Sequence, residues 1–176
     1  MLHFNSIMSQ KTQKDATSVF ARNFIFGVED SLVSTVGLLA GVAVADVERH
    51  TILLTGGVLI AVEALSMGVG SLLSESFAEE YVQGQKDKNS LVGALIMFVS
   101  YAIAGFIPLL PYVIWERGTA FIISIAASCI SLFLLGFLGA RHFGARGYRS
   151  GLRMLLLGGG AIVVGILVGR LLHVSI

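Results

Sequence analysis

The chain has 176 residues, of which 55% are hydrophobic and only 13% are charged, and its mean hydropathy is +0.85. A soluble domain would carry about 25% charged residues, so this composition excludes a soluble protein and indicates an integral membrane protein. With a net charge of +1 and no basic patch interleaved with aromatic residues, the sequence gives no support for nucleic acid as a partner.

Five apolar stretches are long enough to cross a bilayer, because about 20 apolar residues span a hydrocarbon core of roughly 30 Å. They are residues 20–45, 51–77, 90–113, 119–140 and 152–173. The connections between them are too short to fold as domains. The sequence therefore predicts an all-α polytopic membrane protein, with one domain of five transmembrane helices over residues 20–176. A membrane barrel is excluded because barrel strands alternate apolar and polar residues.

The segment before the first span, residues 1–19, is mostly polar. It lacks the short apolar core and small-residue cleavage site of a secretory signal, so we expect the first span to be retained as an anchor. Either Met1 or Met8 could be the start of the chain.

Basic residues are divided unequally between the two sides of the predicted bundle. Nine Lys and Arg residues lie in the N-terminal segment and the second and fourth connections with their edges, and three lie on the opposite side. Cytoplasmic segments carry the excess of Lys and Arg. This division predicts a cytoplasmic N-terminus and a C-terminus on the other side of the membrane, as an odd number of spans requires.

The helical pattern of the second span continues to Tyr81, well beyond its apolar part. A helix from Thr51 to Tyr81 would be about 46 Å long and would protrude into the cytoplasm. Glu75, Glu79 and Glu80 would lie at its end, where they form either a solvated helix end or a vestibule that attracts cations.

Two later features predict structure rather than function. Pro108 and Pro111, near the end of the third span, are expected to break or kink that helix. Gly165 and Gly169, four residues apart in the fifth span, are typical of a site where another helix approaches closely.

Carboxylates lie within two of the predicted spans. Glu29 and Asp30 are in the first span and Glu63 is in the second. A charged side chain in a span costs about 2.5–3.5 kcal/mol on insertion scales, so such acids usually mark a pathway or a binding site. Between Arg22 and Arg49 the chain has no basic residue, so we expect a bound cation or a proton to neutralise these acids.

Each of these two spans has a stripe of acidic, hydroxyl, small or sulfur side chains at the helical spacing i, i+4, i+7 and i+11. The stripes are Asp30, Ser34, Gly37 and Gly41 in the first span and Glu63, Met67, Gly70 and Ser74 in the second. Two helices that face each other along these stripes would line a path with oxygen and sulfur ligands.

The ligand types narrow the cargo to a divalent metal ion. Carboxylate and hydroxyl oxygens suit Mg²⁺, Ca²⁺ or Mn²⁺, and the thioether of Met67 tilts the choice toward iron, cobalt or zinc. Met67 also fits simple core packing, and Asp30 and Glu63 also fit neutral, hydrogen-bonded buried acids. Because desolvation disfavours a charged carboxylate, these acids could lose protons when a cation binds and regain them when it leaves. Acids with this behaviour are the minimum requirement for cation–proton exchange.

Motifs in both acid-bearing spans resemble the vacuolar iron transporter family. They are GVEDSL at 27–32 and GLLAG at 37–41, similar to the family's first helix, and ALSMGVG at 64–70, similar to its second-helix signature. The resemblance implies transport of Fe²⁺ and also Mn²⁺ out of the cytoplasm, driven by proton exchange. It also implies a homodimer whose first helices line a shared pathway, with Asp30 and Met67 as pathway residues.

The chain departs from the family pattern at three places. Many members have a glutamate eight residues before the methionine, where this chain has Leu59, and its own acid, Glu63, lies four before. That shift keeps the same helix face and moves the acid roughly 6 Å along the axis. Some members have a glutamate where this chain has Ser71. Many carry a glutamate-rich metal-binding domain in the second connection, where this chain has only residues 78–89.

The sequence thus predicts a transporter that moves Fe²⁺ or Mn²⁺ out of the cytoplasm by proton antiport. The expected metal ligands of the pathway are Asp30, Glu63 and Met67, with Glu29 as a weaker fourth, and the expected cytoplasmic mouth is formed by Glu75, Glu79 and Glu80. The metal is cargo, and no permanent cofactor is expected. No HExxH, GxSxG or P-loop pattern occurs, so we expect no enzyme activity. The expected location is a prokaryotic plasma membrane or a vacuole-like organelle membrane.

Two other functions fit the same residues. A proton-coupled exporter of small organic cations would use these acids but is expected to have an aromatic-lined pocket, and no aromatic residue lies on either stripe. A membrane scaffold that transports nothing would leave the acids silent in an ion assay, and Asp30→Asn would then affect only folding or dimerisation.

Overall fold

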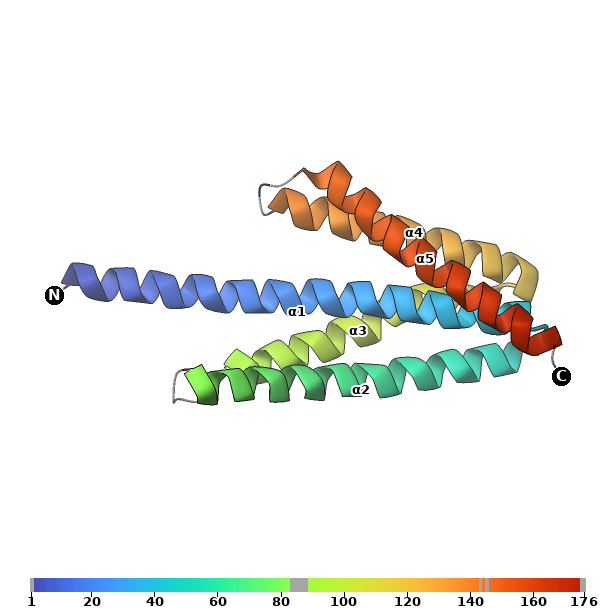
Figure 1. Ribbon diagram of the computed structural model, residues 1–176, viewed down its shortest axis with the longest axis horizontal. Coiled ribbons are helices and arrows are strands. Elements are labelled where there is room, and N and C mark those ends of the chain that lie inside the picture. The colour runs from blue at the N-terminus through green and yellow to red at the C-terminus, as the bar shows by residue number, and fades with distance from the viewer. Residues whose placement is uncertain (1, 83–88, 143, 145, 175–176) are drawn as a thin grey trace.

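The computed structural model describes residues 2–82, 89–142, 144 and 146–174, with side chains described in these ranges except at 2–18, 79–82, 89 and 173–174. The described residues form five α-helices and no strand (Figure 1). The helices are α1 (Leu2–Val44), α2 (Arg49–Val82), α3 (Asn89–Ile114), α4 (Arg117–His142) and α5 (Gly147–Val174).

Each helix contains a stretch that is long and apolar enough to cross a membrane. The stretches are Val19–Val44, Arg49–Ala78, Ser90–Ile114, Arg117–His142 and Gly147–Leu172. The predicted all-α fold with five membrane spans is therefore confirmed, and the chain is an integral membrane protein. The fifth span begins five residues earlier than predicted, because the added turn, residues 147–151, contains the charged Arg149, which hydropathy counts against a span although arginine is a good helix former.

Two helices extend well beyond the apolar part of their spans. The 34-residue α2 ends at Val82, which confirms that the helix continues past its span. The 43-residue α1 begins at Leu2, so the polar N-terminal segment is continuous with the first span. At 1.5 Å per residue α1 is about 65 Å long, roughly twice the thickness of the hydrocarbon core.

The helix α1 is the centre of the bundle. It runs through the middle of Figure 1, with α2 and α3 on one side and the α4–α5 hairpin on the other. Its most extensive contacts are with α3 and α5, whereas α2 packs mainly on α3. Leu32, Val36 and Leu39 of α1 are completely buried. The start of α1 and the end of α5 lie at opposite ends of the bundle, as five spans require.

Glycines allow α1 and α5 to approach until their backbones touch. A Cβ atom at Gly165 or Gly169 would overlap the carbonyl oxygen of Gly37 or Gly41, respectively. A Cβ at Gly41 would likewise lie 2.6 Å from the carbonyl oxygen of Gly165. The predicted close approach at the Gly165–Gly169 pair is confirmed, and the helix that approaches is α1.

The helix α3 continues through Pro108 and Pro111 to Ile114, so of the predicted break or kink the break does not occur. A transmembrane helix tolerates proline where neighbouring helices and hydroxyl side chains support its backbone. Ser124 of α4 provides such support, since its Oγ donates a 2.7 Å hydrogen bond to the carbonyl oxygen of Pro108.

Candidate functional site

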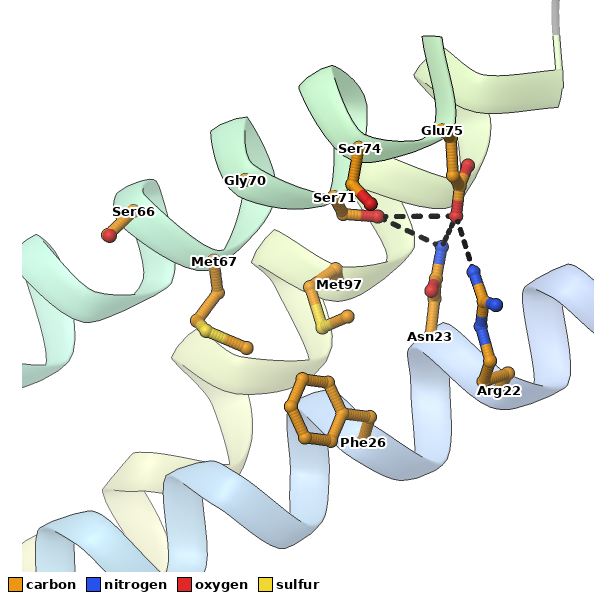
Figure 2. A pocket seen from close by; sticks show the side chains of 10 residues that line it. All are labelled: Arg22, Asn23, Phe26, Ser66, Met67, Gly70, Ser71, Ser74, Glu75 and Met97. Carbon is orange, nitrogen blue, oxygen red and sulfur yellow. Dashed lines mark hydrogen bonds and ion pairs between the residues drawn. The ribbon is translucent and has the colours of Figure 1, made fainter. Parts of the chain in front are cut away.

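A cavity of about 590 Å³ lies between α1, α2 and α3, toward the end of the bundle that holds the α2–α3 connection (Figure 2). Its wall combines one guanidinium, one amide, one carboxylate, three hydroxyls and two thioethers. The lining residues are Arg22, Asn23 and Phe26 from α1, Ser66, Met67, Gly70, Ser71, Ser74 and Glu75 from α2, and Met97 from α3. A water molecule takes up about 30 Å³ in the liquid, so this volume can hold a cation together with several waters.

The polar end of the cavity is organised around Glu75. Its Oε1 accepts hydrogen bonds from Asn23 Nδ2 at 2.8 Å and from Ser71 Oγ at 3.4 Å, and it forms an ion pair with Arg22 at 3.1 Å. Asn23, which is only 2% exposed, also donates to Ser71 Oγ at 3.2 Å. Gly93 of α3 leaves the space for this group, because a Cβ there would lie 2.6 Å from Asn23 Nδ2 and 2.8 Å from Glu75 Oε2.

This arrangement distinguishes, for Glu75, between the two alternatives given for the acids at the end of α2, a solvated helix end and a vestibule that attracts cations. The side chain of Glu75 is only 12% exposed and points into the cavity, so it is not part of a solvated helix end. Glu79 and Glu80 belong to α2, but their side chains lie outside the described part of the chain.

The other end of the cavity is lined by sulfur and an aromatic ring. Met67, Met97 and Phe26 point toward one another from α2, α3 and α1 (Figure 2). Met97 is only 4% exposed, and its Sδ would lie 3.3 Å from a Cβ at Gly27, so this glycine lets the thioether lie against α1. The two thioethers make this end softer, in the sense of metal-ligand preference, than Met67 alone would.

Asp30 and Glu63 lie beyond the cavity, about one helical turn further along α1 and α2 than Phe26 and Met67. The two acids are close enough for their charges to interact with each other and with the phenol of Tyr101. The two predicted acids are therefore near enough to act on each other electrostatically.

Tyr101 of α3 completes this polar cluster and is fully buried. Its hydroxyl shares a 2.7 Å hydrogen bond with Ser34 Oγ, and its carbonyl oxygen accepts a 2.7 Å hydrogen bond from Ser31 Oγ. These hydrogen bonds tie α3 to α1 beside Asp30, while Glu63 of α2 is near enough for its charge to act on Tyr101.

Two expectations about the first span are corrected. Glu29 lies close enough to Arg153 of α5 for the two charges to interact, so a basic side chain from a distant helix helps to neutralise it. Gly37 and Gly41 face α5 rather than α2, and with it they line an apolar groove of about 610 Å³. The α1 stripe therefore faces the polar cluster only at its Asp30–Ser34 end.

Among the described side chains, His, Cys, Asp and Glu form no group of three that could hold a metal ion. The cavity instead offers one carboxylate with hydroxyl and thioether donors. Resident metal sites generally use three or four strong ligands. The oxygen and sulfur donors of the cavity are of the types that bind divalent cations.

Comparison with known proteins places this geometry in a family. The model of the VIT family matches residues 21–90 and 77–170. The chain belongs to the VIT family. The matched stretches contain the cavity and the Asp30–Glu63–Tyr101 cluster, and they meet at the α2–α3 connection. The resemblance inferred from the motifs in the first two spans is thereby confirmed.

Curated VIT family relatives align with most of the chain at low identity. The Vacuolar iron transporter of Toxoplasma gondii is 21% identical over an alignment of 238 residues, which covers 95% of this chain and 79% of that protein. Vacuolar iron transporter 1 of Arabidopsis thaliana is 21% identical over 216 residues, which cover 87% of this chain and 86% of that protein. Vacuolar iron transporter homolog 1 of Oryza sativa subsp. japonica is 28% identical over 167 residues, covering 85% and 72%.

Four residues of the cavity and of the Asp30–Glu63–Tyr101 cluster were not predicted from the sequence as site residues. They are Arg22, Asn23, Met97 and Tyr101. Asn23 is a polar residue inside the first apolar stretch, and that anomaly could have identified it. Met97 and Tyr101 lie in a span without acids and differ from its other residues only in type, so the sequence carried no positional signal for them.

Proposed function

We propose that this VIT family protein moves a divalent transition metal, Fe²⁺ or Mn²⁺, out of the cytoplasm in exchange for protons. The observation that carries the proposal is the cavity whose donors are one carboxylate, hydroxyls and two thioethers, ending one turn from a pair of intramembrane acids. Relatives named as vacuolar iron transporters support the same cargo class.

In this proposal the metal enters the cavity from the cytoplasmic side, past Glu75. The excess of basic residues at the end of the bundle that holds the cavity supports a cytoplasmic location for that end. The metal then passes Met67 and Met97 and reaches Asp30 and Glu63. Thioethers favour borderline metals such as iron over Ca²⁺ and Mg²⁺, which require oxygen ligands.

We infer proton exchange from the position of Asp30 within the membrane. A site of low dielectric constant disfavours uncompensated charge, so in this proposal a divalent cation that arrives at Asp30 replaces a proton there. Protons return when the metal leaves on the far side. Glu29, next to Asp30, is the weaker fourth pathway residue because Arg153 of α5 is close enough to interact with its carboxylate.

A homodimer with the two α1 helices beside a shared pathway completes the proposal. Asp30, Glu63 and Met67 are each only partly buried within a single chain. Charged side chains in a membrane almost always face a protein interior or a water-filled cavity, because exposure to lipid is costly. A second copy that covers these residues would meet that requirement.

Uptake into proteoliposomes with an acidic interior tests the function. We expect Fe²⁺ and Mn²⁺ to enter faster than Ca²⁺. No flux of any metal through well-folded protein would contradict the proposal and favour a membrane scaffold. Among the described lining residues Phe26 is the one aromatic, so the cavity is not the aromatic-lined pocket expected of an organic-cation exporter.

Replacing Met97 with leucine is expected to lower the ratio of Fe²⁺ to Mn²⁺ transport rates about threefold, equivalent to roughly 0.6 kcal/mol. Leucine has nearly the same volume, so the fold should lose less than about 1.5 kcal/mol of stability, while a soft donor disappears from the cavity. Initial rates with each metal measure the ratio. Met154→Leu, in α5 outside the cavity, is the matched control, and an equal change in both variants would contradict a role for the Met97 sulfur.

A further inference from the structure

The ion pair at the mouth of the cavity joins two side chains that differ greatly in their exposure to solvent. The Arg22 side chain is 67% exposed, whereas the Glu75 side chain is only 12% exposed. Figure 2 shows the guanidinium reaching Glu75 from the outer turn of α1, while the carboxylate points into the cavity. The arginine can leave for solvent without any change in the helices.

The carboxylate of Glu75 would stay in place after such a departure. Asn23 Nδ2 and Ser71 Oγ donate to the same Oε1 atom from fixed positions on α1 and α2, and Asn23 is almost completely buried. The remaining oxygen, Oε2, lies against Gly93, whose lack of a side chain makes room for the carboxylate. Glu75 is thus held ready for a cation by neutral hydrogen bonds, independently of Arg22.

The energetics favour exchange of one cation for another at this carboxylate. An ion pair with one largely exposed partner is weak, because water solvates and screens the exposed charge. A divalent cation has twice the charge of a guanidinium and bears it on a single compact centre, so its attraction to a partly desolvated carboxylate is greater. A monovalent cation has no such advantage over arginine.

We propose that Arg22 is a displaceable counter-ion for Glu75. It neutralises the carboxylate while the cavity is empty of metal, and it yields the carboxylate to an arriving divalent cation, which Glu75 and the Ser71 hydroxyl then bind. This inference rests on the proposed function and adds to it a first binding site at the mouth, with a residue that discriminates against monovalent cations. A purely structural tie between α1 and α2 is the competing explanation.

Equilibrium binding of Mn²⁺ to the purified protein, followed by the electron paramagnetic resonance signal of free Mn²⁺, distinguishes the two explanations. Arg22→Gln is expected to lower the Kd about two- to fivefold, because the competing cation is gone. Arg22→Lys keeps the charge and should bind like the wild type. Glu75→Gln is expected to raise the Kd by about tenfold or more, because it removes the carboxylate. Arg117→Gln, which removes an ion pair with Asp46 at the other end of the bundle, is the control and should change nothing.

A structural tie predicts instead that Arg22→Gln and Glu75→Gln weaken binding together, or leave it unchanged, while both lower the thermal stability. Either result would overturn the inference. Uptake by wild-type proteoliposomes is measured in parallel. Metal uptake with no effect of either variant on binding would overturn this inference alone. The expected order of binding affinities without any wild-type uptake would overturn the proposed transport function and leave the Glu75 site standing.

Discussion

Asp30→Asn should abolish metal uptake, with an expected fall of about 100-fold or more in the initial rate. The substitution keeps the size of the side chain but removes a charged ligand and a proton carrier from the middle of the membrane. A hundredfold loss corresponds to about 2.7 kcal/mol, which is within the range for an uncompensated charge in a site of low dielectric constant. Glu63→Gln should behave similarly, since Glu63 lies close enough to Asp30 for their charges to interact.

Glu29→Gln is the matched control for Asp30→Asn. It makes the same chemical change one residue away, where Arg153 is close enough to interact with the carboxylate, and it is expected to lower the rate less than about fivefold. Size-exclusion profiles confirm that each variant is folded. Wild-type flux through Asp30→Asn would contradict the assignment of Asp30 to the pathway, and equal losses in both variants would contradict the weaker role of Glu29.

Gly165→Ala adds a single methyl group but should markedly lower the stability of the protein. A Cβ at this position overlaps the carbonyl oxygen of Gly37, and because that atom belongs to the backbone, no rotamer change can relieve the overlap. The helix α5 would have to move away from α1. We expect a loss of about 1–3 kcal/mol, typical of overpacking.

The control for this change lies on the same helix. No atom lies within 4 Å of a Cβ at Gly159, so Gly159→Ala should leave the stability unchanged or raise it through better helix propensity. Thermal unfolding in detergent, followed by loss of the monodisperse peak, compares the two variants. Equal stability of Gly165→Ala and Gly159→Ala would contradict the close packing of α1 on α5.

The spans were predictable because hydropathy reports the one property that a membrane selects for, namely a long apolar run. Hydropathy does not locate helix ends. Residues 2–18 contain no glycine or proline, so α1 continues through them even though they are polar. The α2 extension was predicted because it was judged from helical periodicity rather than from hydropathy.

Site residues were predictable only where the residue type is energetically unfavourable in its stretch of sequence, as an acid is in an apolar span. Asp30 and Glu63 met that test, because an acid in an apolar run needs an explanation. Tyr101, Met97 and Arg153 gain their roles from which helix lies next to which, and periodicity gives the face of a helix but not its neighbour. For the same reason the small face of α1 was recognised, but its partner, α5, was not.

The most direct test of the account is the pH inside wild-type proteoliposomes while Fe²⁺ or Mn²⁺ enters. Vesicles with an acidic interior and an enclosed pH-sensitive dye report proton exit at the same time as metal uptake. The account predicts that the interior becomes more alkaline as metal enters, and that this change is absent without metal and absent in Asp30→Asn. Metal entry with no change in internal pH would contradict proton exchange at Asp30 and Glu63.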